Sequence, residues 1–270
     1  MPKSTGASYY RPKKNFDKSV KDIVRKELSE ELEEKQAIVE YSAVPLLSGI
    51  PMGAVINGGG NFFKLMPEIS QSTAGGAGAK YNERVGSEIK LKSISIDGFL
   101  TYGTNRAIDL TNSKLAVRVM ILRSKEINDQ ELLFDNMPTD TLLRNGDFSS
   151  SGLAGPTNFT GVPLDSIRDI NRDTFAVRYD KVHYLNANTV LSGTTQVTTT
   201  YTPSGLKMFQ HKLTFGKNGL KLKYSSQADK QANNMPYFMV IGISSMADNA
   251  VPGNNIVEAT FQMTSRYTDA

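Results

Sequence analysis

The 270-residue chain contains no cysteine and no tryptophan, and its only histidines are His183 and His211. Without cysteine, no disulfide can cross-link the fold, and no thiolate can bind a metal or act as a nucleophile. The two histidines do not form an H-x-H or H-x-x-x-H pair, which argues against a histidine-rich metal site. No G-x-S-x-G sequence is present either. We therefore predict no catalytic residue, no metal site and no cofactor, and we expect that the protein is not an enzyme.

Long apolar runs and nucleotide-binding motifs are also missing. The longest apolar run, residues 237–243, is far too short to span a bilayer, and no signal peptide is recognisable. We expect a soluble protein that is made in the cytosol, without membrane insertion. The glycine clusters at 58–60 and 74–79 match neither the P-loop nor the G-x-G-x-x-G pattern, so we interpret them as loops.

Charge is unevenly distributed along the chain, although the net charge is only +4. Residues 1–26 carry eight bases against two acids, whereas residues 27–40 carry six acids against one base. A basic arm with interleaved aromatic residues can neutralise phosphates and stack on unpaired bases. Further lysines occur in one predicted hairpin, where a solvated strand face is an equally good interpretation. We predict that nucleic acid is bound by Lys3, Tyr9, Tyr10, Arg11, Lys13, Lys14, Lys18, Lys21, Arg25, Lys26, Lys212, Lys217, Lys221 and Lys223.

An amphipathic helix is predicted over residues 15–40. Its base-first, acid-last charge order opposes the helix dipole at both ends, so we expect the helix to need a packing partner. Two partners are open: the helix docks on the rest of the chain, or it self-associates with the same helix of neighbouring chains. Its apolar stripe, with spacings of three and four residues, consists of Phe16, Val20, Ile23, Val24, Leu28 and Leu32.

The rest of the chain shows the alternating pattern of β-strands. In residues 84–103, Ile89 and Leu91 alternate with lysines, and the alternation then slips by one residue at Lys92 and Ser93. One extra residue in a strand is typical of a β-bulge, so we predict one long, bent strand. Further strands are predicted at 62–66, 115–123, 174–185, 208–215, 220–224, 236–244 and 257–263. Strands 208–215 and 220–224 are predicted to form a hairpin, and residues 192–204 are predicted to form a loop.

Eight strands without a crossover helix predict an all-β fold. The irregular spacing of the strands favours two packed antiparallel sheets, a single eight-stranded jelly roll, over a barrel of short hairpins. We therefore divide the chain into a basic arm with an amphipathic helix, residues 1–40, and a jelly-roll domain, residues 41–270.

Several segments resemble capsid proteins of circular, Rep-encoding single-stranded DNA viruses, the circovirus-like group. RVGSEIKLKSISIDG (84–98) is similar to the R-[VI]-G-x-x-I-x-[LP]-K-[SN]-[IL] segment of that family, and FAVRYDKVHYL (175–185) to the strand with its D-K-x-x-x-L pattern. RVMILRSK (118–125), LKLKYSS (220–226) and PYFMVIGISS (236–245) resemble further sheet segments. The resemblance covers about residues 54–267, and it depends on the order and spacing of these segments.

The resemblance implies a jelly-roll subunit that assembles with itself, commonly as sixty copies, into an icosahedral shell around a single-stranded DNA genome. It places the protein in the virion, after synthesis in the host cytoplasm and with the host nucleus as a further location, and it implies a host receptor of unknown identity. The arm departs from the family pattern, because Arg11 and Arg25 are the only arginines before Arg84. A capsid protein of a small RNA or satellite virus, and a jelly-roll carbohydrate-binding module, are the alternatives. A carbohydrate-binding module usually presents tryptophan, which this chain lacks.

Overall fold

The computed structural model describes residues 18, 20, 21, 23, 24, 34–50, 61–72, 83–103, 111–129, 142–146, 155–192, 198–226 and 228–269. Contacts between residues divide the chain into two units, Met1–Glu34 and Lys35–Ala270. In the first unit, described residues 18, 20, 21, 23 and 24 are helical, as predicted, whereas Glu34 at its end is not. Residues 35–40, which the sequence analysis assigned to the same helix, belong instead to a strand of the second unit, so that the predicted C-terminal limit of the helix was wrong.

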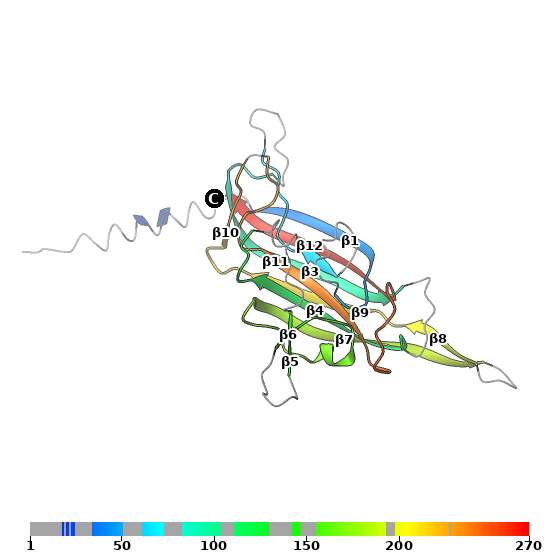
Figure 1. Cartoon of the computed structure of the whole chain (residues 1–270). Helices are drawn as coiled ribbons and strands as arrows, with labels where there is room; N and C mark the ends of the chain where they lie inside the picture. Colours follow the sequence, from blue (N-terminus) through cyan, green and yellow to red (C-terminus); the bar gives the residue numbers. More distant parts are fainter. Residues whose placement is uncertain are drawn as a thin grey trace, which may run out of the picture. The chain divides into compact units, whose positions relative to one another are not determined.

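The first large sheet is antiparallel and built around the long strand β3 (Glu88–Tyr102). The last strand, β12 (Val257–Asp269), pairs with β3 on one side and with β1 (Lys35–Pro45) on the other. The opposite side of β3 pairs with two strands in succession, β9 (Lys207–Thr214) and β10 (Leu220–Lys223). We call this sheet A; Figure 1 shows β1, β12 and β3 side by side.

The second large sheet, sheet B, is also antiparallel. Its strand order is β2 (Phe62–Lys64), β11 (Tyr237–Ser245), β4 (Lys114–Ser124), β7 (Phe175–Ser192) and β8 (Thr198–Ser204). Every residue of β11 is buried, as expected when a continuous apolar run forms a central strand. A small pair, β5 (Leu143–Asn145) with β6 (Gly155–Thr157), and the 3-10 helix η2 (Pro163–Ser166) lie in the connection between β4 and β7.

The structure confirms an all-β fold with two antiparallel sheets, and the arrangement is consistent with a jelly roll. The predicted count of eight strands was wrong, because the described residues of sheets A and B alone form five strands each. Two strands of these sheets were missed, in addition to β5 and β6 of the small pair. β1 lies where a helix was predicted, and β8 lies in the Thr-rich segment that was predicted as a loop.

The predicted hairpin of 208–215 and 220–224 was also wrong. β9 and β10 do not pair with each other; both pair with β3, β9 with Ser93–Leu100 and β10 with Glu88–Leu91. The GKNG segment between them is therefore an insertion in one interrupted edge strand. The turn has Gly216 and Gly219 at φ 72° and 70°, a conformation that residues with a Cβ rarely adopt.

The predicted bulge in β3 is confirmed. Arg266 of β12 pairs with Ser93, and the next residue, Tyr267, pairs with Leu91, so Lys92 is the extra residue. The bulge explains the slip in the sequence pattern. Before it, Ile89 and Leu91 are buried, and beyond it the buried residues fall on the even positions from Ile94 onward.

Apolar side chains on the facing sides of the two sheets form one core. It combines Ile89, Leu91, Ile94 and Ile96 of sheet A with residues such as Val119 of sheet B. The outer side of sheet B has a second core, in which residues of β4, β7 and β11 are covered by the connection between β4 and β7. Its members are Ile50, Phe62, Met120, Leu122, Leu142, Leu143, Phe159, Ile170, Phe175, Phe238 and Val240. Sheet A, in contrast, exposes charged and polar side chains on its outer side.

Candidate nucleic-acid interface

The outer face of sheet A carries lysines because side chains alternate along β3. Ile89 and Leu91 are fully buried, and Lys90 and Lys92 between them are partly exposed on the opposite face. The edge strand β10 has the same pattern, with Leu222 buried and Lys221 and Lys223 exposed. Alternation thus sorts the apolar residues into the core and the lysines onto one surface.

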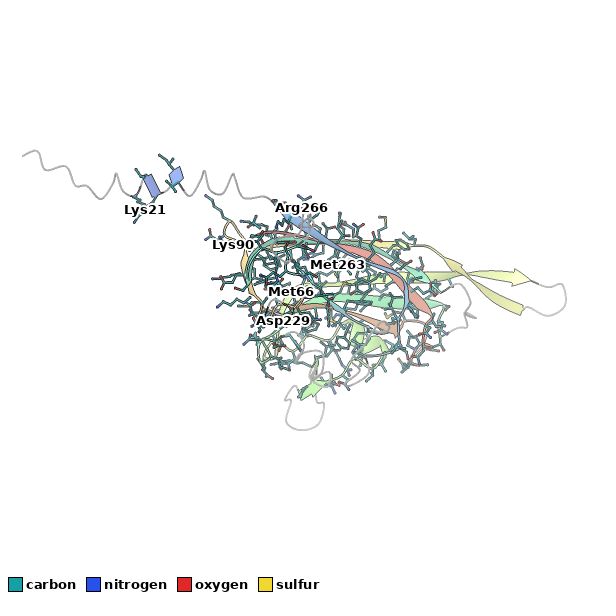
Figure 2. All side chains as sticks on the ribbon, turned by 90° about the horizontal axis from the view of Figure 1, so that it is seen from above. Lys21, Met66, Lys90, Asp229, Met263 and Arg266 are labelled. Atoms are coloured by element: carbon teal, nitrogen blue, oxygen red, sulfur yellow. The ribbon has the colours of Figure 1, made fainter. Side chains whose placement is uncertain are left out.

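Strand register brings these lysines together. Lys221 lies directly opposite Lys90, and Lys223 lies opposite Glu88 on the same strand pair. On β9, exposed Lys212 pairs with Ser95, three residues from the bulge at Lys92. Figure 2 shows Lys90 and Arg266 at the same end of the sheet. We define the basic patch as Lys90, Lys92, Lys212, Lys217, Lys221, Lys223 and Arg266.

Few acidic groups offset this charge. Lys221 Nζ lies 2.6 Å from Glu88 Oε2. The hydrogen bond from Lys221 is the main reason why the pKa of Glu88 is lowered; the charges of Lys221 and Lys223 lower it further, against a smaller opposing effect of desolvation. Asp269 at the end of β12 is paired with Lys35, at 2.7 Å. Further along the described part of the face, the acidic residues Glu40 and Asp97 share one cross-strand row with Gln262 and Gln210.

The placement of Lys221 opposite Lys90 destabilises sheet A of the isolated chain. Like charges directly opposite each other on an antiparallel pair destabilise a sheet. Lys92 donates a hydrogen bond to the carbonyl of Lys217, 3.4 Å away, which holds the insertion between β9 and β10 near the bulge. The lysines and the arginine of the basic patch suit a ligand with closely spaced negative charges, such as a nucleic-acid backbone.

The predicted binding residues fall on two separate parts of the chain, sheet A and the arm. The structure brings Lys212, Lys217, Lys221 and Lys223 together on one exposed surface, although along one edge and not in a hairpin. In the arm, Lys18 and Lys21 are exposed on the helical segment. The remaining predicted arm residues lie outside the described part of the chain: Lys3, Tyr9, Tyr10, Arg11, Lys13, Lys14, Arg25 and Lys26.

The predicted assembly helix can be followed only at its centre. Val20, Ile23 and Val24 are helical, with exposed fractions of 41%, 60% and 49%. Their spacing of three and four residues places them on one side of a helix. Phe16, Leu28 and Leu32 lie outside the described residues.

Arg266 was missed as a member of the patch. The signal was available in the alternation of the last strand, where Met263 and Ser265 are buried and Gln262 and Arg266 are exposed. The predicted strand ended at residue 263, three residues before this exposed arginine.

Neither histidine has neighbours that suggest catalysis. The ring of His211 lies 4.4 Å from that of Tyr179, and the ring of His183 lies 6.2 Å from that of Phe209, between the two sheets. Burial lowers the pKa of both histidines, and the charges of Lys181 and Lys207 lower that of His183 further. Within the described residues, no three His, Asp or Glu side chains are grouped so that they could hold a metal ion.

Two buried arginines hold loops to the sheets. Arg84, at the start of the RVG motif, is fully buried and stacks 4.2 Å from the ring centre of Tyr224. It donates hydrogen bonds to the carbonyls of Ile69, Gly86, Ser226 and Asp229 and to the side chain of Gln71. This role explains the arginine of the motif as a structural residue.

Arg118 has the corresponding role on sheet B. Its guanidinium makes a bidentate contact with Asp180 of the neighbouring strand, at 2.7 and 2.6 Å. It also donates to the carbonyls of Asp165 and Arg168, next to η2. Charge pairs of this kind position the covering loop and leave no charge for a ligand.

Comparisons with known proteins give little further information. No protein-family model matches the chain, and no curated protein matches it. Among solved structures, the chain is similar to that described as the crystal structure of infectious bursal disease virus VP2 subviral particle, at 11% sequence identity and a TM-score of 0.15. The match covers 88% of this chain and 42% of that one. In the described part of the chain, no helix is long and apolar enough to cross a membrane.

Proposed function

We propose that the chain is a structural capsid subunit with a single jelly-roll domain, which assembles with itself into a small icosahedral shell around a single-stranded DNA genome. The observation that carries the proposal is the strand order. With β1, β2, β3, β4, β7, β9, β11 and β12 taken as eight successive strands, sheet A has the order 1-8-3-6 and sheet B the order 2-7-4-5. This interleaving of early and late strands is expected of two Greek keys wound into a jelly roll.

Fold alone does not decide the function, since lectin and cupin domains share this architecture. The resemblance of residues 54–267 to the capsid proteins of circular single-stranded DNA viruses favours a capsid subunit. The basic patch adds a surface suited to a genome, as do exposed Lys18 and Lys21 in the arm. On this proposal, the outer face of sheet A lines the interior of the shell, and the protein's place is the virion.

The helical segment contributes to assembly in this proposal. The side chains of Val20, Ile23 and Val24 leave apolar surface in contact with water unless a partner covers them. A helix of a neighbouring subunit is that partner. The double variant Ile23→Asp/Val24→Asp is expected to weaken assembly, with Asn249→Asp as the control for an added acid at an exposed position. Unchanged assembly of the double variant would contradict this role.

The proposal is tested by negative-stain microscopy of the purified full-length protein, together with the absorbance ratio at 260 and 280 nm after nuclease treatment. Uniform shells with protected 260 nm absorbance are expected. Digestion of the extracted nucleic acid with DNase or RNase then identifies the cargo, and RNA would favour the small RNA virus alternative. A monodisperse monomer at all salt concentrations and pH values would overturn the capsid proposal.

A further inference from the structure

The ribbon formed by β7 and β8 extends beyond the rest of sheet B. β4 begins at Lys114, which pairs with Asn186 of β7, and the amide of Ala187 still donates to the carbonyl of Ser113. Among the described residues, β7 from Asn188 to Ser192 pairs only with β8. Figure 1 and Figure 2 both show this ribbon projecting away from the other strands.

An isolated ribbon of two strands is marginal in water. Three or more strands, or packing against another element, are needed for independent stability. Over this length no other described strand pairs with either edge of the ribbon, so that among the described residues each edge presents backbone N–H and C=O groups without a strand partner. The conformation of the ribbon is thus the one expected of a segment that gains its remaining hydrogen bonds from a partner.

The other edges of sheets A and B, in the described part of the chain, are protected against strand addition, and the β2 edge is only three residues long. β1 has a register shift between Tyr41 and Val44, and Ala43 has a φ of 47°. The β9 edge carries Lys207 and Lys212, and charged edge residues oppose pairing with another chain. The ribbon has none of this protection beyond Pro203 at its base, because no Asp, Glu, Lys or Arg occurs from residue 184 to residue 206.

We propose that β8 pairs with β8 of a second copy of this chain, antiparallel across a two-fold axis, to form a continuous four-stranded sheet. The occupant is a second copy because the same unprotected edge is then satisfied in both subunits, and an isologous contact of this kind closes on itself. The inference rests on the proposed capsid function and specifies one subunit contact within it. A shell with icosahedral symmetry contains the required two-fold axes.

The first experiment shortens the ribbon. Residues 188–202 are replaced by Asn-Gly, which connects the paired residues Ala187 and Pro203 by a two-residue turn. We expect the far-ultraviolet circular dichroism to keep its β signal, because the two cores lie outside the ribbon. Sedimentation velocity is expected to show at least tenfold weaker self-association. If the shortened variant loses its β signal, self-association is measured instead on the double variant Thr200→Lys/Thr202→Lys. Gln262→Lys on the central strand β12 is the control for added charge.

The absence of cysteine allows a second, direct test. Single cysteines at positions 198–202 are oxidised in otherwise cysteine-free protein, so any covalent dimer arises from the introduced thiol. Dimer yield is expected to peak at one position near the two-fold axis and to fall on both sides. Shells formed normally by the shortened and lysine variants, or no cross-link at any of the five positions, would overturn the β8 contact alone. A wild-type protein that stays monomeric would overturn both this contact and the capsid proposal.

Discussion

Lys90 of β3 and Lys221 of β10 lie directly opposite each other on an antiparallel strand pair. Two positive charges in this position repel each other, and Lys221 is compensated by Glu88 on the strand that also carries Lys90. Such a pair weakens the free sheet and becomes favourable when an anion lies across it. The relationship connects the register of sheet A with the proposed binding of a nucleic acid.

Replacement of Lys90 by Gln should therefore affect binding more than stability. We expect weaker binding of single-stranded oligonucleotides whatever their base sequence. The slope of log Kd against the logarithm of the salt concentration should be smaller by about one. Fluorescence anisotropy over a series of salt concentrations measures both. Lys181→Gln, an exposed lysine on sheet B, is the matched control and should leave the slope unchanged. Equal losses in the two variants would show that the patch has no special role.

Arg84→Lys should destabilise the fold, although it keeps the charge. Lysine cannot reproduce the guanidinium's hydrogen bonds to the carbonyls of Ile69, Gly86, Ser226 and Asp229, and several buried acceptors would lose their donor. We expect a loss of about 3–5 kcal/mol in the free energy of unfolding, as for other broken buried charge networks. Urea unfolding followed by circular dichroism measures it. Exposed Arg172→Lys should change stability by less than about 0.5 kcal/mol, and a similar small change for Arg84→Lys would contradict the assigned role.

Gly98 of β3 lies between its paired residues Phe261 of β12 and Phe209 of β9 in sheet A. A Cβ at this position would lie 2.4 Å from Cβ of Phe261 and 2.7 Å from the carbonyl oxygen of Thr260. Because the second atom belongs to the backbone, the clash cannot be relieved by a rotamer change. Gly98→Ala should lower the free energy of unfolding by about 1–3 kcal/mol.

Gly86→Ala is the control for this prediction, since the nearest atom to its Cβ would be 4.0 Å away. Thermal unfolding of both variants gives the comparison. A melting temperature of Gly98→Ala equal to that of Gly86→Ala would mean that the sheet adjusts more easily than the packing indicates.

The two histidines predict how stability changes with pH. Burial lowers the folded-state pKa of His183 and His211 below their ordinary 6.5, so the unfolded chain binds more protons as the pH falls through this region. The contribution of the two neutral histidines to the free energy of unfolding is fully present above about pH 6.5. It is lost as the pH falls from there through their lower folded-state pKa values. We expect the urea midpoint to be lower at pH 5.5 than at pH 7.5. The double variant His183→Gln/His211→Gln should show a smaller difference, and an unchanged difference would assign the effect to other groups.

The sequence by itself determined where most strands lie and which side of each is buried. Alternation of apolar and polar residues is a local property of an extended chain, and it revealed even the bulge at Lys92. Prediction failed where local signals conflicted. Residues 35–40 continue the charged pattern of the preceding helix, yet Ala37, Val39 and Tyr41 alternate as β1 requires.

Tertiary structure decided which strands are neighbours. The turn between β9 and β10 has the residues of a hairpin, but both strands gain more by pairing with β3, whose length accommodates them in succession. Register then placed Lys221 opposite Lys90, and the pairing of β12 with β3 brought Arg266 to the same end of the sheet. Backbone hydrogen bonds between segments far apart in the sequence set these positions, and an alternation pattern specifies a strand's buried face without specifying its partner.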